Sequence, residues 1–190
     1  MKNKPILLVA GEPNSIFLEI LFKIFKDKNF KSPLILICSK QILKSQMSFF
    51  NYKFKIKFLD KNKINSYNLD NNSLNIIDVE YRQKKTFEKI SIKSNSYIKK
   101  SFSIAIKLMK SNLTKKFING PISKKYFLNN KFLGITEYLT SKFKISNTAM
   151  LIYNKKLSVS PMTTHLSIKD VPKKITNKLL INNIKLIDNF

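Results

Sequence analysis

A single histidine offers the most versatile chemistry in this chain. His165 lies in the segment Pro161-Met-Thr-Thr-His-Leu-Ser167, among hydroxyl side chains. A neutral imidazole can serve as a metal ligand or as a general base at physiological pH. One histidine cannot build a metal site, so the other ligands would come from carboxylates, another subunit or sequence outside this chain. The alternative is a surface or hydrogen-bonded histidine with a structural role.

Two short segments could bind an anion. Gly134-Ile-Thr-Glu137 places a hydroxyl and a carboxylate at an expected helix start, where free backbone N–H groups suit a phosphate. The simpler interpretation makes the threonine an N-cap residue and the glutamate a first-turn charge. Asn119-Gly-Pro-Ile-Ser-Lys124 could direct Ser123 and Lys124 toward an anion, or could only turn the chain.

Two further features offer less chemistry. The turn Gly11-Glu-Pro-Asn-Ser15 lacks the G-x-G-x-x-G spacing that lets the backbone approach a dinucleotide pyrophosphate. Cys38 is the only cysteine and ends the apolar run Leu34-Ile-Leu-Ile-Cys38, so no intramolecular disulfide can form. We expect a buried, unreactive thiol there rather than a nucleophile.

The first half of the chain alternates expected strands and helices. The runs 6–10 and 33–39 are continuously apolar, as in strands buried on both faces, while 53–59 alternates as in a half-exposed strand. Further strands are expected at 74–79 and 117–118, and helices at 41–50 and 96–109. A helix that Asn14 or Ser15 can cap follows the first strand. Its expected inward face is Ile16, Leu18, Ile20, Leu21, Ile24 and Phe25.

The second half should contain one or two helical pieces in 127–143, around Gly134, and a hairpin of strands 149–153 and 157–159. Residues 169–190 are expected to form one helix, with an inward face of Ile175, Leu179, Leu180, Ile184 and Leu186 or Ile187. The alternation predicts an α/β fold with a mainly parallel sheet and flanking helices. Ligands of such sheets lie beyond the carboxyl ends of strands, which favours the turns 11–15, 119–124 and 163–167.

Composition restricts the function classes. No run approaches the roughly 18 apolar residues of a membrane-spanning helix, and the start is too short for a signal peptide, so we expect a soluble cytoplasmic protein. The net charge is +25, which could indicate a nucleic-acid-binding module. However, Arg82 is the only arginine, and the lysines are spread over every segment together with Asn and Ile. A coding bias toward A and T explains that mixture better than one binding surface does.

Four motifs taken in order resemble the 4-hydroxythreonine-4-phosphate dehydrogenases of vitamin B6 (pyridoxal phosphate) biosynthesis. They are Gly11-Glu-Pro13, Asn119-Gly-Pro-Ile-Ser-Lys124, Gly134-Ile-Thr-Glu137 and Thr163-Thr-His-Leu166. Each motif alone is weak, but their order and separations together are specific. The resemblance implies that residues 1–190 are the amino-terminal portion of a two-subdomain α/β dehydrogenase, similar to isocitrate and isopropylmalate dehydrogenases, whose carboxyl-terminal portion is absent.

The resemblance also implies a reaction, cofactors and partners. Members of the family use NAD or NADP and a divalent metal (Zn, Mg or Co) to oxidise 4-phosphooxy-L-threonine. The product then loses carbon dioxide to give 3-amino-2-oxopropyl phosphate, and the enzyme works as a homodimer. Thr136 corresponds to a substrate-binding threonine and His165 to the first of three metal-binding histidines. Ile135 stands where the family has a histidine.

Three expectations follow from the resemblance. The chain alone should be inactive and should bind metal poorly, because the other two histidines and most cofactor contacts belong to the missing portion. The replacement at Ile135 leaves open a related dehydrogenase acting on another phosphorylated hydroxy acid. A basic nucleic-acid-binding module is the alternative from a different functional class.

Overall fold

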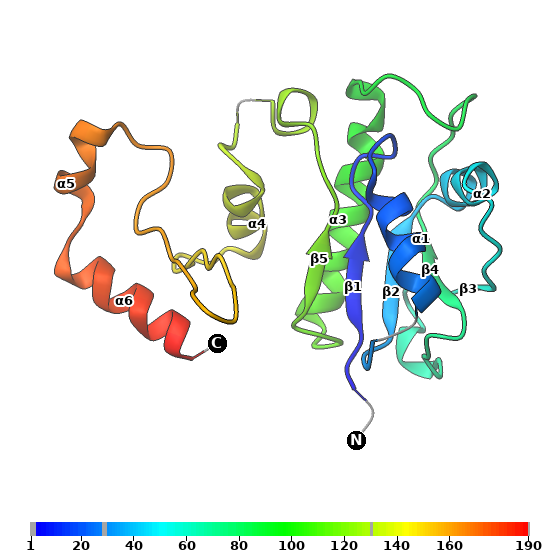
Figure 1. Cartoon of the computed structure of the whole chain (residues 1–190), viewed down its shortest axis with the longest axis horizontal. Helices are drawn as coiled ribbons and strands as arrows, with labels where there is room; N and C mark the ends of the chain where they lie inside the picture. The colour runs from blue at the N-terminus through cyan, green and yellow to red at the C-terminus, as the bar shows by residue number, and fades with distance from the viewer. Residues whose placement is uncertain (1–2, 28–29, 130, 190) are drawn as a thin grey trace. The chain divides into compact units, whose positions relative to one another are not determined.

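The computed structural model describes residues 3–27, 30–129 and 131–189 of the chain. Its backbone divides into two compact units, Met1–Asn129 and Asn130–Phe190 (Figure 1). In the described residues, no helix is both long and apolar enough to cross a membrane.

The first unit is built on a five-stranded sheet in which every pairing is parallel. The spatial order is β3-β4-β2-β1-β5, so the chain builds the sheet on one side of β1 before crossing to the other. This confirms the predicted α/β class. The strands are β1 (Ile6–Val9), β2 (Leu34–Cys38), β3 (Ile56–Phe58), β4 (Leu74–Asp78) and β5 (Phe117–Asn119).

Helices cover both faces of this sheet (Figure 1). Leu8, Leu36 and Ile76 belong to a core cluster with side chains of α1 (Phe17–Asp27) and α2 (Lys40–Phe49). Strand side chains alternate in direction, so Leu7 and Ile37 face the opposite side, where α3 (Asn95–Lys110) contacts β1 and β2. Short helical turns lie at Ile64–Ser66 (η1) and Ile92–Ser94 (η2), and a π-helical turn at Lys124–Leu128 (η3).

The buried face of α1 differs from the predicted one. The helix buries Leu18, Leu21, Phe22 and Phe25, whereas the other expected inward residues, Ile16, Ile20 and Ile24, are 62%, 45% and 49% exposed. Both sets have helical spacing, but only one can face the sheet. The set with the two phenylalanines is buried because these rings pack on Tyr52 and Phe54, with centroid separations of 5.3–6.0 Å.

Two glycines join the carboxyl ends of β1 and β5. Gly120 donates its N–H to the Val9 carbonyl at 2.7 Å, and Glu12 donates its N–H to the Pro121 carbonyl at 2.8 Å. A Cβ on Gly120 would lie 2.2 Å from the Ala10 carbonyl oxygen, and Gly11 has φ +74°. Side chains are thus excluded at both positions, and the two turns pack backbone against backbone.

The second unit contains helices but no sheet among its described residues. Its helices are α4 (Ile135–Phe143), the turn η4 (Ile168–Asp170), α5 (Val171–Lys174) and α6 (Asn177–Asp188). The predicted hairpin is wrong in that residues 149–153 and 157–159 do not form strands. It is reduced to one antiparallel bridge between Ile152 and Val159, with N–H···O distances of 2.8 and 3.0 Å.

The predicted single helix over 169–190 is interrupted. Ile175 takes an extended conformation with ψ 116°, and Thr176 then caps α6 by accepting the Leu179 N–H at 3.2 Å. Of the expected inward residues, Ile175, Leu180, Ile184 and Leu186 are all more than a third exposed. The helix was predicted to face a core, and the described residues of the second unit supply none for these side chains.

Candidate functional site

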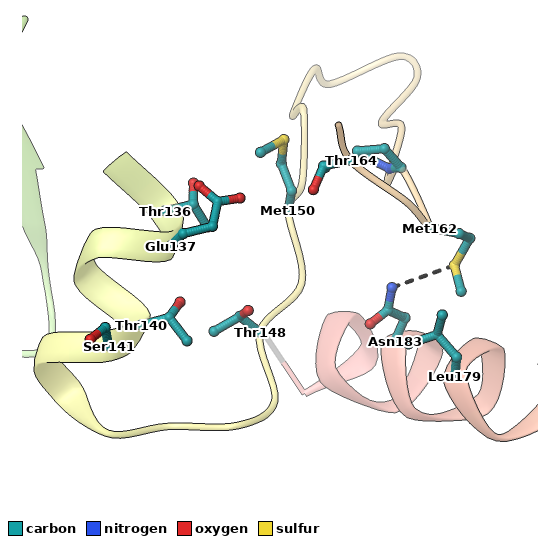
Figure 2. Close-up of a pocket in the computed structure, with 11 residues that line it drawn as sticks. Thr136, Glu137, Thr140, Ser141, Thr148, Met150, Met162, Thr164, Leu179 and Asn183 are labelled. Carbon is teal, nitrogen blue, oxygen red and sulfur yellow. Dashed lines mark hydrogen bonds between the residues drawn. The ribbon is translucent and has the colours of Figure 1, made fainter. Parts of the chain in front are cut away.

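A cavity of about 370 Å³ lies at the amino end of α4, within the second unit (Figure 2). Thr136, Glu137 and Thr140 contribute from α4, and Leu179 and Asn183 from α6. The intervening segment completes the wall with Thr148, Met150, Met162 and Thr164. The cavity therefore combines several hydroxyl groups with apolar side chains and a single carboxylate.

The start of α4 positions Thr136 and Glu137. Gly134 is the N-cap residue, with extended backbone at φ −159°, so Thr136 is the second helical residue and Glu137 the third. The prediction of a helix start at these two residues is confirmed, and both side chains line the cavity. The simpler interpretation of Thr136 as the N-cap is wrong, because the helix begins one residue before it.

Tyr138 anchors this helix on the side away from the cavity lining. Its side chain is buried and packs edge-to-face on Phe132 at 5.5 Å. Burial raises the pKa of its phenol above the ordinary value. The ring thus fixes the first turn of α4, and with it the two residues that face the cavity.

Glu137 sets the charge of the cavity. It is the only ionisable side chain among the described lining residues. One carboxylate oxygen, Oε2, is buried and has no hydrogen-bond partner in the described part of the chain. The same oxygen lies over Gly134, where a Cβ would approach it to 3.0 Å. A carboxylate at this helix end repels anions, so this cavity suits a phosphate less well than the sequence motif suggested.

His165 lies on the surface beside this cavity rather than in its lining. Its neighbour Thr164 lines the cavity, whereas His165 is exposed and has a positive φ of 58°. The expectation of a histidine at the end of a strand is wrong, because only the single bridge at Val159 precedes it. In the described residues no three His, Cys, Asp or Glu side chains gather as a metal site would require. The residues present therefore do not fit a complete metal centre.

The Gly11 turn is filled by the protein's own polar side chains. Glu12 is buried, and its carboxylate accepts hydrogen bonds from the Ser94 hydroxyl at 2.8 Å and the Asn14 N–H at 3.3 Å. Asn14 in turn accepts the Glu88 N–H at 2.8 Å and the Gln83 amide at 3.2 Å. This turn is a structural junction between β1 and the segment 83–94.

The other two candidates in the first unit also have structural roles. Ser123 caps η3 by accepting the Tyr126 N–H at 3.2 Å, while Lys124 is exposed. Cys38 is fully buried, and burial raises the pKa of its thiol far above the usual range. The prediction of a buried cysteine is confirmed.

Sequence reasoning missed the contribution of Asn183, on α6, to the cavity. Asn183 is only 7% exposed and donates its amide to the Met162 sulfur at 3.4 Å (Figure 2). The apolar pattern of this helix predicts that its leucines and isoleucines, and not an asparagine, face inward. The available signal was an asparagine at the centre of an otherwise amphipathic segment.

Comparison with known proteins places this geometry in a family context. The 4-hydroxythreonine-4-phosphate dehydrogenase of Wigglesworthia glossinidia brevipalpis is 25% identical over 186 residues, which is 97% of this chain and 55% of that protein. The enzyme of the same name from a Sulfurihydrogenibium strain is 39% identical over 70 residues, 36% of this chain and 22% of that protein. The chain thus spans about half the length of relatives that it matches along its whole extent.

Solved structures agree on the fold. The crystal structure of the 4-hydroxythreonine-4-phosphate dehydrogenase from Klebsiella pneumoniae superposes with a TM-score of 0.79, covering 98% of this chain and 58% of that one. That from Burkholderia phymatum gives 0.78, covering 96% and 56%. Both are 18% identical, so they establish the shared fold alone. The family model described as pyridoxal phosphate biosynthetic protein PdxA matches residues 29–190, and the chain therefore belongs to the PdxA family.

Proposed function

We propose that this chain supplies part of a 4-hydroxythreonine-4-phosphate dehydrogenase. The reaction is the NAD(P)-dependent oxidation of 4-phosphooxy-L-threonine, followed by decarboxylation to 3-amino-2-oxopropyl phosphate, in the cytoplasm. A divalent metal (Zn, Mg or Co) and a homodimeric assembly belong to the same proposal. The single observation that carries it is the family match over residues 29–190, which includes the cavity-lining segment at α4.

Thr136 is the proposed substrate contact within this chain. Its position in the first turn of α4 and in the cavity lining supports this role, since a hydroxyl there can donate to or accept from a bound polar group. His165 is proposed as one metal ligand, and its exposure leaves the imidazole accessible. Further ligands would have to come from outside the described residues.

The isolated 190-residue chain is proposed to be inactive. Two observations support this: the chain spans 55% of a full-length relative, and no group of three metal-ligating side chains exists among its described residues. Activity would be measured as 4-phosphooxy-L-threonine-dependent formation of NAD(P)H, with and without added divalent metal. Turnover by the 190-residue chain as a monomer would overturn the proposed inactivity.

Substrate binding tests the function separately from turnover. We expect 4-phosphooxy-L-threonine to bind the chain weakly, and Thr136→Val to reduce the affinity about tenfold, the typical effect of a lost hydrogen bond to a charged ligand. The matched control is Thr114→Val, a buried threonine of the first unit. If wild type and Thr136→Val bind 4-phosphooxy-L-threonine with equal affinity, the cavity is not the binding site for this substrate.

One observation favours a related substrate. Ile135 is the first residue of α4, and its apolar side chain cannot donate the hydrogen bond available to the histidine of the family pattern. A dehydrogenase of another phosphorylated hydroxy acid is therefore the second candidate. Restoring the histidine with Ile135→His should strengthen binding of 4-phosphooxy-L-threonine if that compound is the substrate.

A further inference from the structure

A second cavity, of about 450 Å³, lies within the first unit, between α3 and the segment that contains η1. It shares no lining residue with the cavity at α4. Helix α3 and its C-cap residue supply one continuous face, because their lining residues recur at spacings of three and four over about three turns. These residues are Lys100, Ser103, Ile104, Lys107, Leu108 and Ser111. The opposite wall consists of Lys61, Asn62, Ile64 and Asn65.

The floor of this cavity is apolar. Ile64, Ile104 and Leu108 line it and are only 5%, 8% and 5% exposed. Side chains that are so deeply buried contribute the inner surface of a cavity and not its rim. An apolar floor offers little to a fully hydrated ion, but it favours a ligand that brings an apolar group of its own.

The rim of the cavity is basic. Lys61 on one wall and Lys100 and Lys107 on the other are exposed, and none of the described lining residues is acidic. No ion pair to these three lysines is formed within the described part of the chain. The carboxylate of Asp60, next to the rim in sequence, accepts the Asn62 N–H at 2.8 Å. The three ammonium groups therefore remain available to an anion from solution.

Hydrogen bonds within the segment 60–67 hold the wall opposite α3 in place. The Asp60 N–H donates to the Tyr67 hydroxyl at 3.1 Å, and the Ser66 hydroxyl donates to the Lys63 carbonyl at 2.8 Å. The buried side chain of Ile64 anchors the same segment. A wall that is already ordered reduces the entropy lost when a ligand binds.

Charge alone does not define a site in so basic a chain. Another basic hollow is lined by Lys84, Lys85, Phe87, Glu88 and Lys89, none of which is buried. There the Glu88 carboxylate accepts the Lys84 N–H at 2.8 Å, so the surface carries its own negative charge and has no buried floor. The cavity at α3 differs because it combines three lysines, no lining carboxylate and a buried apolar floor.

We propose that the cavity between α3 and η1 binds a small phosphomonoester that carries an aromatic or aliphatic group. The phosphate lies at the rim, because lysine ammonium groups bind phosphate as point charges, and the apolar group lies against the floor. Ser103, Asn62 and Asn65 add neutral hydrogen-bond donors around the phosphate. The volume is within the range typical of small-molecule sites. This site does not depend on the proposed function, since no residue of the α4 cavity takes part.

The first test compares three probes by titration calorimetry with the full chain at one fixed salt concentration. Phenyl phosphate carries both groups, inorganic phosphate only the charge, and phenol only the ring. We expect phenyl phosphate to bind about tenfold or more tightly than either of the others, because it alone contacts both the rim and the floor. Equal affinities for phenyl phosphate and inorganic phosphate would overturn the proposal, since the charge alone would then explain binding.

Paired variants separate this site from the general attraction of a basic chain for anions. Lys100→Gln with Lys107→Gln should weaken phenyl phosphate binding about tenfold or more. Lys99→Gln with Lys115→Gln removes the same charge at exposed positions outside the cavity and should leave the affinity unchanged. Equal losses in the two double variants would contradict a site at α3.

A blocking variant tests the cavity without any change in charge. Ser103→Phe, at an exposed lining position, fills the cavity and should abolish phenyl phosphate binding, whereas Ser96→Phe, exposed on the same helix outside the cavity, should not. Circular dichroism verifies that both variants keep their helical content. Unchanged binding to Ser103→Phe would overturn the proposal.

Two further measurements identify the location and the kind of ligand. Thr136→Val should leave phenyl phosphate binding unchanged, and a loss there would place the probe in the α4 cavity and refute the site. The Lys100→Gln, Lys107→Gln variant should bind 4-phosphooxy-L-threonine as the wild type does, whether or not that compound is the substrate. Lysine-dependent binding of phosphatidylglycerol vesicles without binding of phenyl phosphate would assign the surface to a lipid headgroup and contradict a small-molecule site.

Discussion

The two units differ most in what they bury. Every buried hydrophobic residue of the described chain except Tyr138 belongs to the first unit, although the second contributes most of the exposed large hydrophobic side chains. The first unit has a sheet covered on both faces, whereas the described residues of the second form the helices α4, α5 and α6, the turn η4 and one β-bridge. Burial of apolar surface is the main favourable contribution to folding, so only the first unit has an adequate core of its own. Among the described residues, the second unit leaves most of its large apolar side chains exposed.

The largest expected effect is on independent folding. Residues 1–129, expressed alone, should unfold cooperatively on heating, because the core cluster and both covering helix layers are complete in that segment. Residues 130–190 alone should show no cooperative transition, and in the 190-residue chain they should promote association through exposed apolar surface. Circular dichroism and light scattering measure both properties. A cooperative unfolding transition of residues 130–190 as a monomer would contradict the claim that only the first unit has an adequate core.

Side-chain truncation should separate the units next. Phe22→Ala should destabilise the chain by about 3–5 kcal/mol, since the ring is fully buried and packs on Tyr52 and Phe54. Ile184→Ala, at a site 56% exposed, should change the free energy of unfolding by less than about 0.5 kcal/mol. Urea titration gives both values. A large effect at Ile184 would mean that α6 packs against a core after all.

A smaller effect on stability is expected from substituting Gly120, in the turn that follows β5. Gly120→Ala should cost roughly 1–3 kcal/mol, because the new methyl meets the Ala10 backbone, which cannot move without disturbing β1. Gly134→Ala is the matched change in the second unit. There the methyl meets only the end of the Glu137 side chain at 3.0 Å, so the cost should stay near the 1 kcal/mol or less typical of N-cap changes. Similar costs at the two glycines would contradict this reasoning.

The pH dependence of the first unit provides a finer test. Burial raises the pKa of Cys38 above its ordinary value of 9.0, so the folded state keeps the thiol protonated while the unfolded state ionises. The contribution of this group is complete below about pH 9 and is lost as the pH rises further, by up to about 1.4 kcal/mol per pH unit. Cys38→Ala should flatten that part of the stability profile. An unchanged slope would mean that the thiol is not protected in the folded chain.

The same difference in burial explains which predictions succeeded. The strands at 6–9 and 34–38 were predictable because continuous apolar runs are buried by contacts within the first unit. In α6 the apolar face was predicted to be inward, but Leu180 and Ile184 are exposed because the described chain holds no partner for them. A hydrophobic pattern indicates which residues need burial, and it does not identify the molecule that buries them.

In the candidate site, too, features set by local sequence were predictable, whereas features that depend on contacts between distant segments were not. Thr136 was found from its motif, because a glycine before hydroxyl and acidic residues marks a helix start locally. Neither Asn183 nor Met162 was found, since their proximity depends on the path between α4 and α6. The location of His165 was wrong for a related reason: the preceding strand was predicted from composition, but only one pair of residues forms bridge hydrogen bonds.

The hydrogen bonds around Glu12 also affect the kinetics of folding. Its bond to Ser94 spans 82 residues, and the bonds of Asn14 to Gln83 and Glu88 span 69 and 74. Contacts between residues so distant in sequence carry a large loop-closure entropy, and we expect them to form after the transition state, once β1, α1 and β2 have assembled. Ser94→Ala should therefore accelerate unfolding and leave the refolding rate nearly unchanged, as stopped-flow measurements over a range of urea concentrations would show. Slower refolding would mean instead that the Gly11 turn belongs to the folding nucleus.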